Sequence, residues 1–161
     1  MTIFATHAPQ YWAAGLPVIP LKPFDSPEKG AGKAPILPDW TRYGTQQPSD
    51  LEKAMWVKAY PNHNIGLPFG AASGLCAIDI DTEDEDLIAA ILDILPPTPW
   101  TRVGAKGMGL IYKWSGQRNF KLRGEEGGMI LEFLGMGNQM VVPPSIHPDT
   151  KRPYTADNHL Y

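Results

Sequence analysis

The sequence predicts a single domain of the α/β (α+β) class, in which helices and strands are mixed along the chain. Its 161 residues are about the length of one domain. Hydrophobic residues make up 43% and charged residues 19%, a balance that is typical of a folded chain and not of a disordered one. Helix-start signals alternate with short apolar runs of strand length. We therefore assign residues 1–161 to one domain.

The first elements are expected to be a helix, a strand, a loop and a second helix. Residues 9–14 predict the helix, since Gly15 can end it, and the apolar residues 17–21 predict the strand. The loop that follows is rich in Pro, Gly and Lys. It lacks the full phosphate-loop pattern, although its Lys33 could reach a ligand. Ser49-Asp-Leu-Glu52 is a capping box, so the second helix is expected to begin there.

The remaining chain supplies most of the strands. An apolar run at residues 75–81 predicts a buried strand, preceded by a shorter one at 64–67. Thr82-Glu-Asp-Glu85 is a second capping box, which predicts a helix with its apolar residues on one face. Prolines end that helix. Further strands are expected at residues 101–103, 110–114 and 129–133, with 139–142 as the hairpin partner of the last.

The charges are unevenly distributed although the net charge is only −3. Residues 79–93 hold seven acids and no Lys or Arg, and residues 102–123 hold six bases and no acid. One interpretation is two solvated faces that attract each other. The other is a site that binds cations with one block and phosphates with the other. The low net charge argues against a protein that coats DNA through general basicity.

Several protein classes are not indicated. No apolar run is long enough to span a bilayer, so no membrane contact is expected. The N-terminal residues lack the basic and apolar regions of a secretory signal. A single cysteine, Cys76, excludes a disulfide framework and a zinc cluster. These observations predict a cytoplasmic protein.

Two aspartates in the run Ala77-Ile-Asp79-Ile-Asp81 are the first candidate site residues. Side chains alternate along a strand, so Asp79 and Asp81 are expected to project from one face. Two like charges on one face repel each other unless they share a cation, and carboxylate oxygens suit Mg²⁺ or Mn²⁺. The alternative is that both aspartates are solvated at the end of the strand.

Glu132 is the third candidate, because it is the only charged residue in the apolar run at 129–134. Burying an isolated carboxylate is costly unless it is paired or binds a metal. If its strand lies beside the strand of Asp79, three carboxylates converge, as two-metal phosphoryl transfer requires. Alternatively, Glu132 faces solvent on an edge strand.

A segment after the last predicted strand carries two further candidates. Paired prolines precede Ser145 and His147 and fix the backbone there, so both side chains could hydrogen-bond a triphosphate. The alternative is a structural role, which is the commoner one for a lone histidine in a loop.

Taken in order, these segments resemble the N-terminal domain of bifunctional DNA primase/polymerases, in the archaeo-eukaryotic primase superfamily. The resemblance covers nearly the whole chain and depends on the order and spacing of the motifs. They are Trp12-Ala-Ala-Gly15, Pro17-Val-Ile-Pro-Leu21, Gly32-Lys-Ala-Pro35, Asn64-Ile-Gly66, Ser73-Gly-Leu75, Ile78-Asp-Ile-Asp81, Leu131-Glu-Phe133, Gly137-Asn-Gln139 and Val142-Pro-Pro-Ser-Ile-His-Pro148.

The resemblance implies an RRM-like catalytic sheet with helices packed on it, joined to an N-terminal α/β part. It also implies a nucleotidyltransferase that makes and extends primers on single-stranded DNA from NTPs or dNTPs, in phage or plasmid replication in a bacterial cell. Asp79, Asp81 and Glu132 match the family's acids and would hold two Mg²⁺ or Mn²⁺ ions. Members commonly carry a helicase further along the chain, so a helicase is an expected partner.

The chain departs from the family at one position. Many members have a histidine that contacts the triphosphate, and the aligned residue here is Gly109. The contact is then expected from the basic residues Arg102, Lys106 or Lys113, or from Ser145 and His147, because Arg and Lys pair with phosphate oxygens. Otherwise the domain is a weakened catalyst.

Two other functions remain open on the sequence. One is a non-catalytic module that binds single-stranded DNA or recruits a helicase, with aromatic residues such as Trp40, Trp56 and Trp114 stacking on bases. For Trp56, packing in the core is the alternative. The other function is a metal-dependent nuclease, which would use the same carboxylates.

Overall fold

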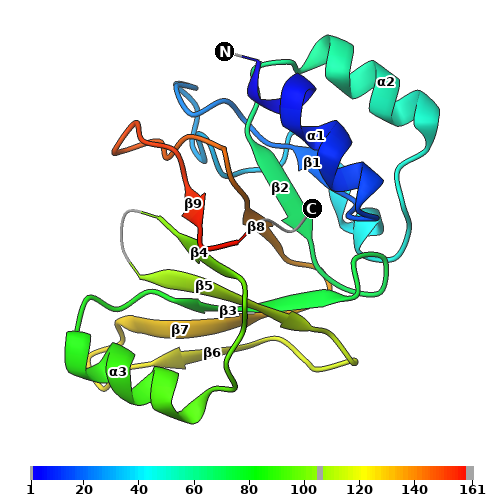
Figure 1. Cartoon of the computed structure of the whole chain (residues 1–161). Helices are drawn as coiled ribbons and strands as arrows, with labels where there is room; N and C mark the ends of the chain where they lie inside the picture. The colour runs from blue at the N-terminus through cyan, green and yellow to red at the C-terminus, as the bar shows by residue number, and fades with distance from the viewer. Residues whose placement is uncertain (1, 105–106, 159–161) are drawn as a thin grey trace.

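The computed structural model describes residues 2–104 and 107–158, and the strands of this part form two antiparallel sheets (Figure 1). The smaller sheet has the order β1-β2-β8, with β1 at Ile19–Pro20, β2 at Ile65–Pro68 and β8 at Gln139–Val141. The larger sheet has the order β6-β7-β3-β5-β4-β9. In chain order its strands are β3 (Leu75–Ile80), β4 (Thr101–Val103), β5 (Met108–Lys113), β6 (Phe120–Arg123), β7 (Met129–Leu134) and β9 (Thr155–Ala156).

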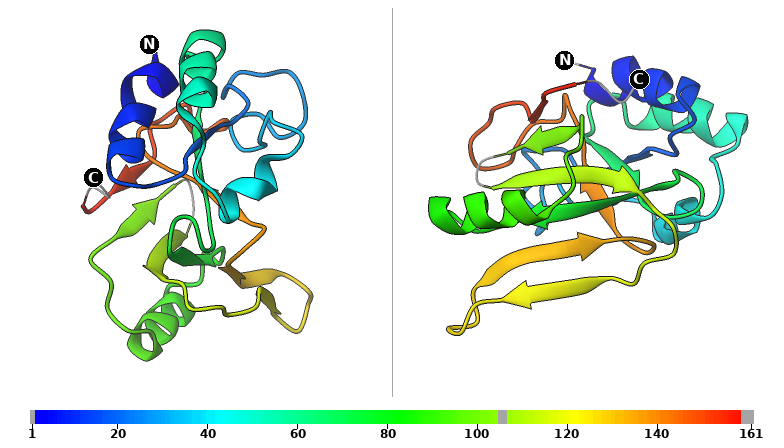
Figure 2. Two further views of the ribbon diagram at one scale, coloured as in Figure 1. Left: turned by 90° about the vertical axis from the view of Figure 1, so that its right-hand side faces the viewer. Right: turned by 60° about the horizontal axis from the view of Figure 1, so that its bottom comes forward.

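The helices lie on opposite sides of the molecule (Figures 1 and 2). Helices α1 (Ile3–Ala13) and α2 (Asp50–Ala59) contact each other and cover the smaller sheet, together with the 3-10 helix η1 (Trp40–Gly44). Helix α3 (Glu85–Ile94) lies against the larger sheet. In the described part of the chain, no helix has the length and apolar character needed to cross a membrane.

The main hydrophobic core joins the helices α1 and α2, the smaller sheet and one face of the larger sheet. It contains Phe4 and Tyr11 of α1, Leu67 of β2, and Ala77 and Ile111 of the larger sheet, all buried. The neighbours of Ala77 in β3 point the other way and form a second cluster with α3. The larger sheet therefore has an inner face, toward the smaller sheet, and an outer face, which carries α3.

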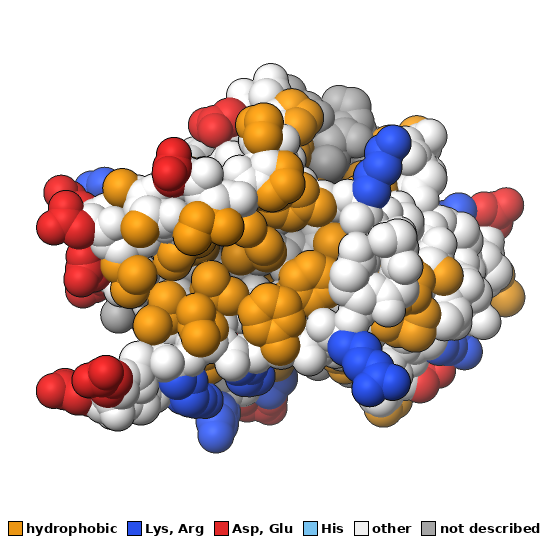
Figure 3. Space-filling view, turned by 90° about the horizontal axis from the view of Figure 1, so that it is seen from below, with side chains coloured by type: hydrophobic (Ala, Val, Ile, Leu, Met, Phe, Trp, Pro, Cys, Tyr) orange, Lys and Arg blue, Asp and Glu red, His pale blue; other side chains and the backbone are white. Residues whose placement is uncertain are grey.

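The outer face is only partly covered by α3. Phe120 and Leu122 of the edge strand β6 remain 53% and 48% exposed, and the Phe120 ring stacks on Phe133 at 5.6 Å between centroids. Figure 3 shows hydrophobic side chains gathered across the middle of this face, with acidic side chains at one end and Lys and Arg along one side.

The strand order β7-β3-β5-β4 with α3 after β3 is that of an RRM-like sheet, but β6 occupies the place of a second helix between β5 and β7. More than one helix was expected on this sheet. In the described part of the chain, α3 is the helix that packs against it.

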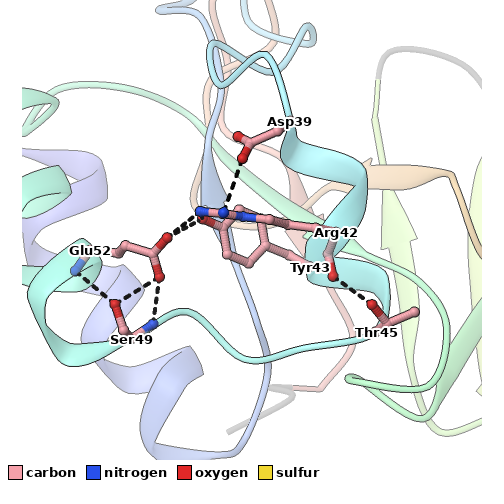
Figure 4. Close-up of polar contacts among 6 residues, drawn as sticks. All are labelled: Asp39, Arg42, Tyr43, Thr45, Ser49 and Glu52. Atoms are coloured by element: carbon pink, nitrogen blue, oxygen red, sulfur yellow. Dashed lines mark hydrogen bonds and ion pairs between the residues drawn. The ribbon is translucent and has the colours of Figure 1, made fainter.

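The start of α2 is held by a network of polar side chains (Figure 4). The capping box is confirmed: Ser49 Oγ accepts from the Glu52 amide at 3.3 Å, and the Ser49 amide donates to Glu52 Oε2 at 2.7 Å. Tyr43 Oη donates to Glu52 Oε1 at 2.8 Å, and Arg42 pairs with both Glu52 and Asp39. The hydrogen bond from the Ser49 backbone, with that from Tyr43, lowers the pKa of Glu52. This network joins η1 to α2.

Two helix starts differ from the sequence prediction. Helix α1 begins at Ile3, six residues earlier than expected, because Ile3, Phe4, Ala8 and Tyr11 share a buried face and Pro9 is accommodated inside the helix. In α3 the cap is Asp84, whose carboxylate accepts from the Leu87 amide at 3.0 Å. The capping box predicted at Thr82 is therefore wrong by two residues.

One strand pairing also differs. Residues 139–142 were expected to form a hairpin with 129–133, but β8 pairs with β2 in the smaller sheet. The chain leaves the larger sheet after Leu134, where Asn119 Oδ1 accepts from the Gly135 amide and Gly137 has a φ of 86°. This crossing carries β8 to the junction of the two sheets, where the candidate site lies. Strands β6 and β9 and helix η1 were not predicted.

Candidate active site

The candidate site is a row of residues that runs across the inner face of the larger sheet. Strand register places Lys121 opposite Glu132, Glu132 opposite Asp79, Asp79 opposite Gly109, and Gly109 opposite Arg102. Side chains at directly opposed positions of an antiparallel pair project from the same face. The expected adjacency of the strands of Asp79 and Glu132 is thus confirmed, in the order β6-β7-β3-β5-β4.

Each acid of this row is paired with a base. Arg102 Nη2 lies 2.7 Å from Asp79 Oδ1, and Lys121 Nζ lies 2.5 Å from Glu132 Oε1. The Arg102 side chain is only 12% exposed, whereas that of Lys121 is 61% exposed. The acidic and basic blocks of the sequence therefore meet here, and the pair of Arg102 is the better shielded from solvent.

Because Gly109 has no side chain, Arg102 can extend across it to Asp79. A Cβ added at Gly109 would lie 2.6 Å from Met140 Cε, 2.7 Å from Met140 Sδ and 3.2 Å from Arg102 Nε. Any side chain at this position would compete for space with Met140 and Arg102. The space in front of Gly109 is thus occupied by Arg102 and Met140.

Burial raises the pKa of the Asp79 carboxyl above its usual value. Arg102 opposes this shift, while the negative charges of Asp81 and Glu132 add to it. Asp81 follows directly after β3, and its backbone amide donates to the Ile130 carbonyl at 2.9 Å. The charges of the other two predicted acids therefore act on Asp79.

The donor chemistry of these acids fits a divalent ion. Carboxylate oxygens are the hard ligands that Mg²⁺ and Mn²⁺ prefer. Within residues 2–104 and 107–158, however, no group of three His, Cys, Asp or Glu side chains is placed to hold a metal ion. The expected convergence of three carboxylates is thus not present in the side-chain arrangement, because Arg102 and Lys121 hold Asp79 and Glu132. Both cations would have to release their partners before three acids could share an ion.

A cleft of about 280 Å³ opens beside Asp79, between the two sheets. Predicted site residues on its wall are Lys33, Asp79, Asp81, Arg102 and His147. Other lining residues are Ile80, Gly104, Leu134, Gln139, Met140, Val141, Asp149 and Tyr154. One cleft thus combines carboxylates with three basic side chains from separate parts of the sequence.

His147 is one of these basic residues, and its hydrogen bonds fix its tautomer. Its Nδ1 accepts from the amides of Asp149 at 3.2 Å and Thr150 at 3.4 Å. Burial lowers the pKa of His147, and the charges of Lys33 and Arg102 lower it further. A neutral ring whose Nδ1 accepts carries its proton on Nε2, so His147 can act as a hydrogen-bond donor without being charged.

Ser145 does not line the cleft, contrary to the prediction that it contacts a triphosphate. It is fully buried; its Oγ accepts from the Ile65 amide at 2.8 Å and donates to the Ile65 carbonyl at 3.4 Å. Its hydroxyl is therefore committed to the start of β2. Of the pair predicted to bind phosphate, only His147 lies on the cleft wall.

The other predicted residues are placed as follows. Glu132 is next to Asp79 in register but is not on the wall of the cleft. Lys113 lies at the far end of β5, four residues beyond Gly109 and about 13 Å along the strand. It is exposed and does not line the cleft, so of the alternatives for the phosphate contact it is not one that the structure brings to Asp79. Lys106 lies outside the described residues.

Asn64 is a structural residue of the site to which the sequence analysis assigned no role, although it belongs to one of the motifs that carry the resemblance. Its Nδ2 donates to the carbonyls of Gly32 at 2.9 Å and Ile146 at 2.7 Å, and its Oδ1 accepts from the Ile146 amide at 3.0 Å. It is fully buried and thus fastens the loop of Lys33 to the segment of His147. A polar residue at the start of an apolar strand is the signal that could have identified it.

Tyr154 and Gln139 were also given no role in the site by the sequence analysis. The Arg102 guanidinium lies 5.2 Å from the centroid of the Tyr154 ring, and the ring packs against His147 at 5.3 Å. Burial raises the pKa of Tyr154 to about 12, so it stays neutral at physiological pH. Gln139 Nε2 donates to the Lys33 carbonyl at 2.9 Å, and its buried Oε1 has no hydrogen-bond partner. These two residues support Arg102 and Lys33.

Comparison with known proteins identifies a family for the chain. A search of curated proteins finds no match to the chain. The family model described as "Bifunctional DNA primase/polymerase, N-terminal" matches residues 8–160, which include every described residue on the wall of the cleft. The chain therefore belongs to the family of N-terminal domains of bifunctional DNA primase/polymerases.

Proposed function

We propose that this domain is a template-directed nucleotidyltransferase that makes primers on single-stranded DNA and extends them with NTPs or dNTPs. Family membership supports a primase/polymerase role in DNA replication. The observation that carries the proposal for this chain is the cleft in which Asp79 and Asp81 face Lys33, Arg102 and His147. Phosphoryl transfer depends on such a combination, since acids bind the metal and bases bind the triphosphate.

Asp79, Asp81 and Glu132 would hold Mg²⁺ or Mn²⁺. A bound divalent ion would lower the pKa of the primer 3′-hydroxyl and neutralise charge on the triphosphate. Asp79 and Asp81 lie two residues apart and line the cleft, and Glu132 is opposite Asp79. This donor set supports a two-metal mechanism once Arg102 has released Asp79 and Lys121 has released Glu132. Lys121 is well exposed, so its ion pair is the weaker constraint.

Arg102, Lys33 and His147 would bind the triphosphate. Arg102 supplies a planar fork of donors, Lys33 a mobile positive charge, and neutral His147 an Nε2–H donor. Ser145 would make no contact with the triphosphate, because its hydroxyl is bonded to the Ile65 backbone outside the cleft. The three donor residues would replace the contact made elsewhere in the family by the histidine at the position of Gly109.

The setting of this activity is also a proposal. We infer action in phage or plasmid replication in a bacterial cytoplasm, with a replicative helicase as partner. The buried free thiol of Cys76 is compatible with a reducing compartment.

Primer synthesis on single-stranded DNA with Mn²⁺ or Mg²⁺ tests the proposal. The wild-type domain should make primers from NTPs or dNTPs, and the Asp79→Ala/Asp81→Ala variant should lose at least about 10³-fold of the rate, as expected when a metal site is removed. Asp93→Ala, which removes an exposed acid of α3, is the matched control and should retain activity.

Three outcomes would contradict the proposal. An active double variant would remove the acids from the mechanism. DNA binding without synthesis, unaffected by metal or by the acids, would indicate a non-catalytic module. Trp56 would not take part in such binding, because it is 5% exposed in the core and has no free face on which a base could stack. Degradation of the DNA without added nucleotides would instead indicate a nuclease.

A further inference from the structure

Arg102 occupies the position that a ligand of Asp79 would need. Its Nη2 is hydrogen-bonded to Asp79 Oδ1 at 2.7 Å, and the side chain is 12% exposed. The Tyr154 ring lies beside the guanidinium, 5.2 Å from its central carbon to the ring centroid. This ion pair lies on the wall of the cleft, since both residues line it. A cation that binds Asp79 therefore has to compete with Arg102.

Arg102 also has hydrogen-bonding capacity that is not used. Its Nε is buried and has no hydrogen-bond partner. An unpaired buried donor is costly, and a guanidinium can bind one anion through two of its nitrogens. Lys33 and His147 line the same cleft, so an anion there would meet several donors at once.

We propose that Arg102 exchanges partners during the binding of substrates: it neutralises Asp79 in the ligand-free protein and transfers to a phosphate oxygen once a divalent ion takes Asp79. This inference rests on the proposed function. Its physical basis is that two cations beside one carboxylate repel each other, whereas a triphosphate offers Arg102 an alternative anion in the same cleft.

The exchange gives Arg102 opposite effects on the two ligands. Arg102 weakens the binding of a divalent ion that is added without triphosphate, because the ion has to displace Arg102 from Asp79. It strengthens the binding of a triphosphate, because it supplies a charged donor. An arginine that only supports the fold would not change the two affinities in opposite directions.

Two titrations test this with the purified domain at pH 8 and low ionic strength. In the first, Mn²⁺ alone is added and free Mn²⁺ is followed by electron paramagnetic resonance. In the second, inorganic triphosphate is added without metal and followed by calorimetry. Arg102→Gln should bind Mn²⁺ about fivefold more tightly than the wild type and triphosphate about fivefold more weakly, the scale of an ordinary coupling between sites. Arg118→Gln, which removes an exposed arginine outside the cleft, should change neither affinity.

Asp79→Asn provides the reciprocal measurement and a second route if Arg102→Gln fails to fold. It releases Arg102, so metal-free triphosphate should bind about fivefold more tightly. Asp81→Asn removes the same charge from the same cleft, but among the described residues the ion pair of Arg102 is with Asp79 and not with Asp81, so this variant should give a smaller gain.

The outcomes separate this inference from the proposed function. Wild-type protein that binds Mn²⁺, together with an Arg102→Gln variant that binds it equally or more weakly, would overturn the exchange alone. Equal gains in triphosphate affinity in Asp79→Asn and Asp81→Asn would also overturn it. Failure of both the wild type and Arg102→Gln to bind Mn²⁺ would overturn the exchange and the proposed metal site together.

Discussion

Asp79 of β3 lies directly opposite Gly109 of β5, and this glycine lets Arg102 reach the carboxylate from the strand beyond. Three neighbouring strands thus contribute one acid, one empty position and one base. Arg102 and Met140, a residue of the smaller sheet, both lie in the space in front of Gly109.

The substitution Gly109→His is therefore expected to destabilise the domain. The new side chain would meet Met140 and Arg102, and Met140 is 3% exposed, so it has little space into which it can move. Overpacking of this kind costs about 1–3 kcal/mol in the free energy of unfolding. Urea denaturation measures the loss.

The double variant Gly109→His/Met140→Ala should recover part of that loss, because it removes the clashing atoms. Gly128→His is the control: no atom lies within 4 Å of a Cβ there, so stability should change little. Equal stability of Gly109→His and the wild type would show that the space in front of Gly109 is not filled as described.

Ser145→Ala should reduce stability and leave triphosphate binding unchanged. The hydroxyl is fully buried and bonded only to the Ile65 backbone, so its removal leaves the Ile65 amide without that acceptor. The expected cost is about 1–3 kcal/mol. Urea denaturation and calorimetry with inorganic triphosphate check the two halves of this prediction. A loss of affinity at unchanged stability would restore Ser145 to the phosphate site.

The sequence predicted those parts of the fold that depend on local signals. The capping box at Ser49 and Glu52 depends only on neighbouring residues, and it was confirmed. The same is true of the strand around Asp79, whose successive side chains point to opposite faces of the sheet. Strand β6 was missed because its residues, with Lys121 and Arg123 between apolar ones, are all exposed on an edge. The partner of β8 could not be predicted, since the choice of sheet depends on the path of the chain after Leu134.

The same distinction applies to the site. Residue types at 79, 81 and 132 indicated carboxylate chemistry, but their ion pairs with Arg102 and Lys121 depend on strand register across the sheet. For Ser145 and His147 the sequence could not tell which would be buried against β2 and which would line the cleft. That separation follows from the Asn64 clamp, which is formed by residues 82 positions apart.

Asn64→Ala should therefore be among the more destabilising substitutions. It removes three hydrogen bonds in a fully buried position and leaves the carbonyls of Gly32 and Ile146 without their donor. A loss of about 2–4 kcal/mol is expected in urea denaturation. Asn62→Ala, at an exposed position nearby, should change stability by less than about 0.5 kcal/mol. Similar effects of the two variants would argue against the clamp.

The lowered pKa of His147 predicts a dependence of stability on pH. Below the ordinary value of 6.5 the unfolded chain takes up a proton that the folded protein still resists, because burial, Lys33 and Arg102 disfavour the charged ring. The contribution of His147 to stability is thus fully present above pH 6.5 and is lost as the pH falls through the lowered pKa. Urea denaturation at pH 7.5 and 5.5 measures the difference.

His147→Asn should reduce that difference, since the amide oxygen of asparagine can accept the hydrogen bonds made to Nδ1 but does not titrate. Part of the loss of stability between pH 7.5 and 5.5 should remain in this variant, because burial also lowers the pKa of His63. The variant His63→Gln should remove that second part, and the double variant should lose most of the dependence in this range. If His147→Asn and the wild type lose equal stability between pH 7.5 and 5.5, the ring of His147 is not kept neutral by its surroundings, and its assignment as an uncharged donor to phosphate fails.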